Sequence, residues 1–108
     1  MKSGSPDESR PEVEIVWSRT GLRRLREIRQ YIAADKPAAA ERLAARIVSV
    51  VAALRVHPYL GRAGSELNVR ELVIGGTPYI VIYKLSSRRV TLLTIWHGAQ
   101  PKGLSSLP

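Results

Sequence analysis

Three short apolar runs, each separated from the next by turn residues, dominate the second half of the chain. They are Val69–Ile74, Tyr79–Leu85 and Val90–Trp96. The first break, Gly-Gly-Thr-Pro at 75–78, supplies glycines that tolerate positive φ and a proline without an N–H donor. The second break, Ser-Ser-Arg-Arg at 86–89, is short and polar. Because a parallel pair would need a crossover of about a dozen residues, these runs predict an antiparallel three-stranded meander.

An alternating segment and two helical segments precede the meander. Residues Glu12–Trp17 alternate acidic and apolar side chains, which predicts a strand with one buried face. Ser18 is suited to cap the next helix, which must end near Asp35 because Pro37 disfavours a helical conformation at the residue before it. Pro37 is itself suited to the first position of a second helix. The apolar stripes are Leu22, Leu25, Ile28 and Ile32 in the first helix, and Ala40, Leu43, Ala44, Ile47, Val50, Val51 and Leu54 in the second.

The order of these segments predicts an α+β fold. It has an N-terminal strand, an α-helical hairpin closed by the His-Pro pair at 57–58, a loop over 59–64, and the three-stranded antiparallel meander. We expect the helices to pack on one face of the sheet. The central run of the meander is apolar on both faces, with Tyr79, Val81 and Tyr83 on one and Ile80 and Ile82 on the other. The face without helices is therefore expected to bind a partner.

Length and composition indicate one globular domain. The chain has 108 residues, of which 44% are hydrophobic. Residues 1–11 are expected to form a disordered N-terminal tail, residues 12–100 the domain, and residues 101–108 a short C-terminal tail. There is no cysteine, which excludes a disulfide scaffold and a thiolate zinc site. Because no apolar run is long enough for a membrane helix or resembles a secretory signal, we expect a cytoplasmic protein with no membrane partner.

The net charge of +8 predicts an acidic or polyanionic partner. The first helix carries a basic outer face that could follow a phosphate backbone. However, the sequence shows neither a recognition helix nor a sheet with stacked aromatic residues, so direct DNA binding without another protein is not expected. The residues of this basic face are Arg19, Arg23, Arg24, Arg26 and Arg29.

Motifs for catalysis or cofactor binding are scarce. No glycine-rich phosphate loop precedes a helix, and the two histidines, His57 and His97, have no clustered carboxylates near them in sequence. The sequence therefore predicts no metal and no cofactor. His97, at the end of the last strand, is suited to general acid–base chemistry, or alternatively to a hydrogen bond that shapes the turn at Gly98. Arg70 is suited to holding a partner's carboxylate or phosphate, or to pairing with Glu71 or Glu66.

The whole pattern resembles the RelE/ParE superfamily of toxins from type II toxin–antitoxin systems. The resemblance extends from about Val13 to Gln100, and the segments that carry it are VEIVWS, IRQYIAADKPAAAERLAARI, HPYLGR, VRELVIGGTPYIVIYKL and VTLLTIWHGAQ. It implies the fold described above, a cognate antitoxin that is acidic and partly disordered when free, and one of two activities.

The first activity is cleavage of mRNA in the ribosome, and the sequence departs from the branch that has it. The resemblance places the basic residues of that branch at Glu71, Val73, Ile80 and Gln100, none of which is basic here. Cleavage at phosphate needs cations to stabilise the developing charge. The resemblance therefore favours the ParE-like branch, whose members inhibit DNA gyrase and have no known chemical step of their own.

Two sets of candidate residues follow. The candidates for contact with the antitoxin or the target are Arg70, Ile80, Ile82, Tyr83, Trp96 and His97. If the chain were instead a RelE-like mRNA endoribonuclease, its catalytic residues would be His97, Arg70 and Lys84. A third alternative is a non-toxic module that only binds an antitoxin.

Overall fold

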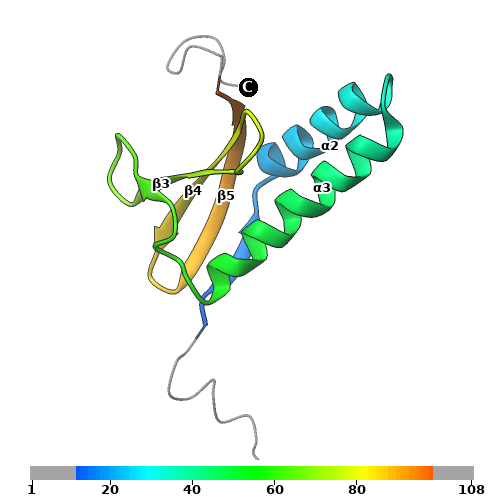
Figure 1. The fold of residues 1–108 in the computed structure, drawn as a ribbon. Coiled ribbons are helices and arrows are strands. Elements are labelled where there is room, and N and C mark those ends of the chain that lie inside the picture. The colour runs from blue at the N-terminus through cyan, green and yellow to red at the C-terminus, as the bar shows by residue number, and fades with distance from the viewer. Residues whose placement is uncertain (1–11, 99–108) are drawn as a thin grey trace, which may run out of the picture.

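The computed structural model describes residues 12–98, so the tails expected at 1–11 and 101–108 lie outside the described range. Two helices cover one face of a five-stranded sheet whose strand order is β1-β5-β4-β3-β2 (Figure 1). The α+β class and the helix-on-sheet arrangement are thus confirmed. The elements are β1 (Glu14–Trp17), α2 (Arg19–Ala33), α3 (Pro37–Ala52), a single 3-10 turn η1 (Ala53–Arg55), β2 (Arg62–Ala63), β3 (Val69–Val73), β4 (Tyr79–Ser86) and β5 (Arg89–His97).

Helices α2 and α3 begin and end close to where the sequence predicts. The Ser18 hydroxyl accepts a hydrogen bond from the Gly21 N–H at 2.9 Å, which caps α2, and Pro37 occupies the first turn of α3. Ala40 is completely buried, and its small side chain lets the two helices approach closely. Neither helix within residues 12–98 is long and apolar enough to span a membrane.

The core lies between the helices and the sheet. Tyr79, Val81 and Tyr83 of β4 face this core, as the alternation of the strand predicts. Most residues of the predicted helical stripes pack against them, and β5 adds further side chains from the neighbouring strand. Leu22 is the exception, since it is 46% exposed and its predicted place on the buried face of the helix is wrong. The largest fully buried side chains are Tyr83, Ile47, Leu54, Ile74, Leu92, Ile95, Val51, Val81 and Val90.

Three features of the sheet differ from, or go beyond, the sequence prediction. Strand β1 pairs with β5 in parallel, so the two halves of the chain share one sheet. The loop expected over 59–64 contains a short strand, β2, which pairs antiparallel with β3. The register between β4 and β5 shifts at Ile82/Tyr83, because Leu93 is an extra residue that forms a β-bulge.

Candidate partner-binding surfaces

The sheet face opposite the helices is built from rows of residues that run across β3, β4 and β5. The first row, Val73, Ile80 and Trp96, is entirely apolar. The next row contains Glu71, Ile82 and Thr94, and the third contains Val69, Lys84 and Thr91. This face therefore changes from apolar at one end to polar and cationic at the other.

The apolar end of this face is only partly accessible. Val73 is 51% exposed, whereas Ile80 and Ile82 are 8% and 5% exposed. The Glu71 carboxylate forms an ion pair with Arg62 at 3.1 Å. At the other end of this row, on β5, the hydroxyl of buried Thr94 has no hydrogen-bond partner within residues 12–98. A partner would thus contact Val73 and half-buried Trp96 first, with the two isoleucines as the floor beneath them.

Tyr83 lies on the opposite, helix-covered face and is completely buried. Its hydroxyl accepts a hydrogen bond from the Gly61 N–H at 2.9 Å and donates one to the Pro58 carbonyl at 2.7 Å. Burial raises the pKa of this phenol, although the Gly61 N–H and the Arg70 charge act in the other direction. Because no part of the ring reaches the surface, we assign Tyr83 to the core and not to a binding surface.

Arg70 points to the same side of the sheet as Tyr83, its partner in the register. Its guanidinium donates a hydrogen bond to the Gly61 carbonyl at 2.6 Å and stacks over the Tyr59 ring, 4.9 Å from the centroid. Of the two alternatives for Arg70, pairing with Glu71 or Glu66 is not seen, since no ion pair joins Arg70 to a carboxylate within residues 12–98. The reason is geometric: successive residues of a strand point to opposite faces, which sends Glu71 toward Arg62 instead.

The three residues proposed for a catalytic alternative do not converge. His97 is opposite Tyr79 in the register, whereas Lys84 lies five positions further along β4. That spacing separates them by about 17 Å along the strand. In addition, Lys84 points to the helix-free face, whereas Arg70 points to the helix side. No single substrate phosphate could contact all three side chains in this conformation.

His97 borders a depression between α2 and the ends of β4 and β5. Its ring meets the Tyr79 ring edge-on, with centroids 5.3 Å apart. Arg24, Glu27 and Tyr31 complete the lining of the depression. The pKa of Tyr79 is raised, chiefly by burial and further by Tyr31, while Arg24 acts in the opposite direction. A titratable cluster therefore exists at this end of the molecule, but without the cations of Arg70 and Lys84.

A sequence model described as the ParE toxin of the type II toxin–antitoxin system parDE matches residues 15–101. The chain belongs to this family. It is therefore the toxin component of a type II toxin–antitoxin system, as the sequence resemblance predicts, and membership of a parDE family implies an antitoxin partner.

Curated relatives and a solved structure agree with this family. A protein of Sinorhizobium fredii named "Putative toxin Y4kP" is 46% identical over 86 residues, covering 80% of this chain and 88% of that protein. "Toxin RelE2" of Caulobacter vibrioides is 33% identical over 87 residues, covering 81% and 97%. The fold is similar to a chain of the chromosomal ParDE system from P. aeruginosa, with a TM-score of 0.70, 21% identity, and coverage of 78% of this chain and 94% of that chain.

In this ParE-family toxin, the positions that the resemblance assigns to basic residues of the mRNA-cleaving branch lie close together. Glu71, Val73 and Ile80 all face away from the helices, and Val73 and Ile80 are direct partners in the register. The fourth position, Gln100, lies outside the described residues. One carboxylate and two aliphatic side chains thus occupy this part of the helix-free face.

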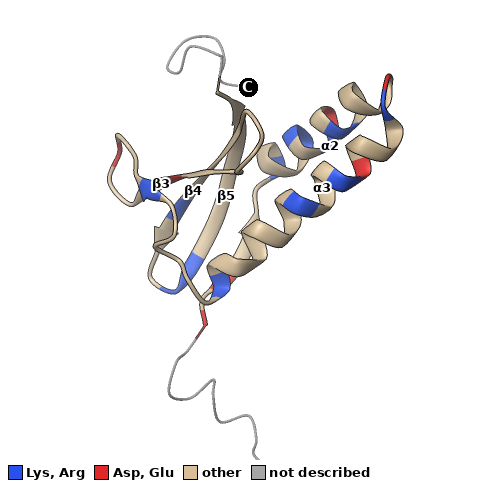
Figure 2. Cartoon of the chain, viewed as in Figure 1, with Lys and Arg blue, Asp and Glu red and all other residues tan. Residues whose placement is uncertain are grey.

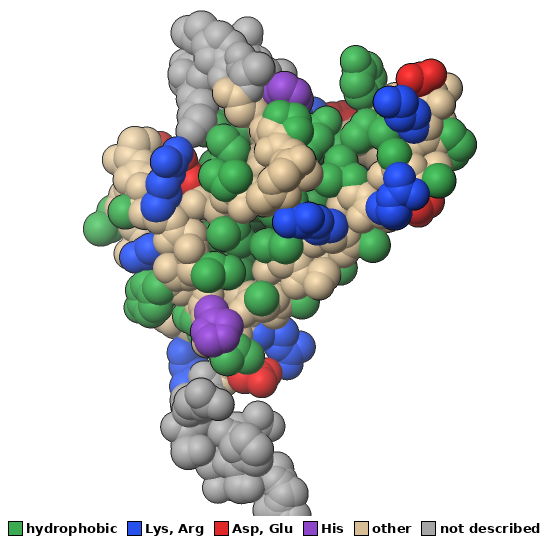
Figure 3. All heavy atoms as spheres, viewed as in Figure 1, with side chains coloured by type: hydrophobic (Ala, Val, Ile, Leu, Met, Phe, Trp, Pro, Cys, Tyr) green, Lys and Arg blue, Asp and Glu red, His purple; other side chains and the backbone are tan. Residues whose placement is uncertain are grey.

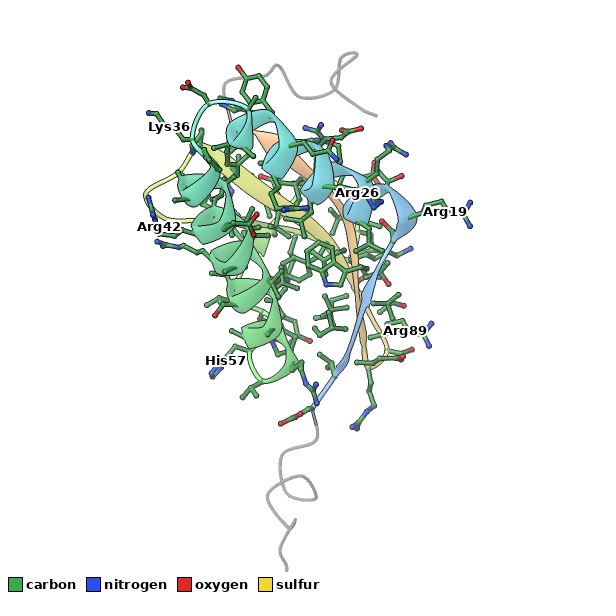
Figure 4. All side chains as sticks on the ribbon, turned by 90° about the vertical axis from the view of Figure 1, so that its right-hand side faces the viewer. Arg19, Arg26, Lys36, Arg42, His57 and Arg89 are labelled. Atoms are coloured by element: carbon green, nitrogen blue, oxygen red, sulfur yellow. The ribbon has the colours of Figure 1, made fainter. Side chains whose placement is uncertain are left out.

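The basic face of α2 is less uniform than the sequence indicates. Arg24 turns toward the sheet and donates a hydrogen bond to the Ile95 carbonyl at 3.2 Å, so its predicted place on the outer side is wrong. Arg29 forms an ion pair with Glu41 of α3 at 2.7 Å. Arg19 projects away from the body of the protein, as do Lys36 and Arg42 (Figure 4). The remaining charge is scattered around the helix pair and forms no continuous stripe.

The sequence analysis did not predict that the loop between η1 and β3 forms a candidate binding surface. Four of its hydrophobic side chains are exposed although it contains a strand and several hydrogen bonds. The sequence carries no strong signal for it, because Tyr59, Leu60 and Leu67 are the only large apolar residues between His57 and Leu67 and stand among glycines and polar residues. Within residues 12–98, no three His, Asp or Glu side chains lie close enough to hold a metal ion.

Proposed function

We propose that this ParE-family toxin inhibits DNA gyrase by binding to it and performs no chemical step itself. The observation that carries the proposal is the replacement of cations by Glu71, Val73 and Ile80 at adjacent positions of the helix-free face. Cleavage at phosphate depends on cations placed around the developing charge, and a carboxylate there would oppose it. Inhibition by binding requires no cluster of cations around a phosphate. This function requires a cytoplasmic location, where gyrase acts.

We further propose that an acidic, partly disordered segment of the antitoxin folds onto the helix-free face. The apolar row of Val73, Ile80 and Trp96 would receive its aliphatic side chains, and Ile82 continues the same floor. The net charge of +8 favours an acidic partner, which a disordered segment can supply over a large area. Direct DNA binding by the free toxin is not part of the proposal.

A supercoiling reaction tests the function. Purified toxin is added to gyrase and relaxed plasmid across a concentration series, with and without the antitoxin. The proposal predicts inhibition that increases with toxin concentration and is relieved by the antitoxin. Full supercoiling at a large excess of toxin would contradict it. If the toxin also failed to arrest growth when expressed alone, the chain would be a module that only binds its antitoxin.

A RelE-like mRNA endoribonuclease is the second candidate, favoured by the 33% identity to a protein named Toxin RelE2. That activity would require a titratable group, and His97 in its depression beside Tyr79 is the best placed. The variant His97→Ala separates the two candidates. Folded H97A with wild-type toxicity would exclude a nuclease that uses His97, whereas loss of toxicity together with loss of mRNA cuts in translating ribosomes would exclude the gyrase proposal.

A further inference from the structure

Exposed hydrophobic side chains are concentrated in one loop. Eight large hydrophobic residues are exposed in the described part of the chain, and four of them lie between residues 56 and 67. We call these four the loop surface: Val56, Tyr59, Leu60 and Leu67, which are 47%, 69%, 53% and 86% exposed. In Figure 3, hydrophobic and basic side chains alternate along the left-hand edge of the molecule, over the loops next to β3. Clustered apolar exposure of this kind marks interaction sites more often than scattered exposure does.

The loop is held rigidly from beneath, so the exposure is not a consequence of poor packing. Tyr83 binds both the Pro58 carbonyl and the Gly61 N–H, and Arg70 binds the Gly61 carbonyl. The ends of the loop are tied by backbone hydrogen bonds from Leu60 to His57 and from Gly64 to Val69. A surface that is already fixed loses little conformational entropy when a partner binds, which raises its affinity.

A cation, Arg70, lies within this surface and forms no ion pair with any carboxylate of residues 12–98. The Arg70 guanidinium stacks under Tyr59 and lines a depression of about 440 Å³ together with Leu67 and Leu85. One of its N–H groups is bonded to the Gly61 carbonyl, and no ion pair within residues 12–98 uses the others. The rest of the lining is mostly polar and includes the Glu66 carboxylate. Leu67 and Leu85 lie next to the Arg70 guanidinium, which fits an aliphatic side chain followed by a carboxylate that binds on the Arg70 side of the depression.

The loop surface is distinct from the apolar row of the helix-free face, although Val69, from the polar end of that face, also lines the depression. Arg70 and Leu85 point to the helix side of the sheet, whereas Ile80 and Trp96 point to the other side. A toxin binds its antitoxin and also its target, and two separate apolar surfaces meet that requirement. This step rests on the proposed function, in which the target is gyrase and the antitoxin occupies the helix-free face.

We propose that the loop surface binds the target protein, with Tyr59 and Leu67 receiving an aliphatic side chain and Arg70 receiving a neighbouring carboxylate. Residues at the centre of such an interface contribute most of the binding free energy, and aromatic residues and arginine are prominent among them. The antitoxin segment bound to the helix-free face would then block the target's approach around the β2–β3 edge.

The test uses two matched double variants of the full chain. Tyr59→Ser/Leu67→Ser removes the two most exposed residues of the loop surface, and Leu22→Ser/Val48→Ser removes two exposed aliphatic residues from the helices. All four positions are exposed, so both variants should fold like wild type, which urea unfolding checks. The concentration for half-inhibition of purified gyrase and the affinity for the antitoxin are then measured for each.

The loop variant should need at least about tenfold more toxin for half-inhibition, while its antitoxin affinity stays within about twofold of wild type. The helix variant should inhibit gyrase like wild type. Unchanged inhibition by the loop variant would overturn the proposal, as would loss of antitoxin binding with inhibition intact. If wild-type toxin does not inhibit gyrase, the proposed function fails and growth arrest replaces it as the readout. Arrest by the loop variant equal to wild type then overturns the loop proposal too, and loss of arrest with antitoxin binding intact supports it.

Discussion

Single side chains in this toxin join segments that are distant in the sequence. Tyr83 is the main example, because one buried hydroxyl satisfies a backbone N–H at Gly61 and a backbone carbonyl at Pro58. Both groups belong to the loop that presents the four exposed hydrophobic residues. A buried phenol with two hydrogen bonds stabilises the fold by more than its buried apolar area alone would, because removing the hydroxyl leaves two buried backbone groups without a hydrogen-bond partner. The side chain thereby links the core to a candidate binding surface.

We predict that Tyr83→Phe lowers the free energy of unfolding by about 1–3 kcal/mol. The ring still fills its space, but the Gly61 N–H and the Pro58 carbonyl lose their partner. Urea unfolding followed by circular dichroism measures the change. Tyr59→Phe is the control, since Tyr59 is 69% exposed and its substitution should cost less than about 0.5 kcal/mol. Equal stability of the two variants would show that the hydroxyl does not hold the loop.

The raised pKa values of Tyr79 and Tyr83 predict a loss of stability in alkali. Burial is the main cause of both shifts above the ordinary value of 10.0. The unfolded chain therefore releases these protons at a lower pH than the folded chain does. The stabilisation is complete below pH 10 and is lost as the pH rises above it, toward the folded-state pKa values.

Urea unfolding at intervals from about pH 9 to about pH 11 measures this dependence. The free energy of unfolding should fall more steeply in wild type than in Tyr79→Phe, which removes one of the two groups. Tyr59→Phe is the matched control because Tyr59 is 69% exposed and contributes to neither shift. Identical slopes for wild type and Tyr79→Phe would contradict the predicted contribution of Tyr79.

Among the secondary-structure elements, the short strand β2 directly follows a closely packed glycine. It pairs with β3 through Arg62 and Ala63, and Gly61 immediately before it lies against the Tyr83 ring. A Cβ at position 61 would lie 2.9 Å from the Glu71 carbonyl oxygen and 2.9 Å from atoms of Tyr83. Neither neighbour can move away cheaply, since one is backbone and the other is buried.

Gly61→Ala should therefore lower the free energy of unfolding by about 1–3 kcal/mol, as overpacking does in well-packed regions. Gly75→Ala is the comparison, because the nearest atom to its added Cβ is the end of the flexible Arg46 side chain at 3.4 Å. The difference between the two variants in urea unfolding tests the claim. If Gly61→Ala were as stable as Gly75→Ala, the loop could relax, and its preorganisation would be in doubt.

The secondary-structure elements also show which parts of the fold could be predicted from the sequence. The meander, the helical hairpin and the Ser18 cap depend on local patterns of apolar, turn and capping residues, and all three were predictable. The parallel pairing of β1 with β5 joins residues more than 70 positions apart, and no local pattern encodes it. The bulge at Leu93 depends on the register between two strands and is likewise invisible in either strand alone.

The candidate sites, too, could be predicted only where they depend on local sequence patterns. Strand alternation predicted that Ile80 and Ile82 share the face without helices, and the structure places them there. Alternation also separates Arg70 from Glu71 and Lys84 from His97, which the grouping of these residues in sequence did not take into account. The loop surface was not predicted, because its exposure results from the hydrogen bonds that Tyr83 and Arg70 make to the loop from distant strands.

As a whole, the molecule combines a cationic helix layer with two apolar surfaces on different sides of the sheet. Arginine and lysine outnumber carboxylates along both helices (Figure 2). Arg19, Arg26 and Arg42 form no ion pair within the described range. Such a charge distribution speeds association with acidic partners and makes it sensitive to salt. It suits the proposed capture of this toxin by an acidic antitoxin segment.

The central claim is that inhibition results from binding, and a titration of gyrase with this toxin tests it most directly. Complex formation is measured by analytical ultracentrifugation, and supercoiling is measured in the same mixtures. We predict a saturable complex of fixed stoichiometry, with inhibition that follows its occupancy and does not grow with incubation time. Absence of a complex at concentrations that arrest growth, or inhibition by catalytic amounts of toxin that increases with time, would contradict the account.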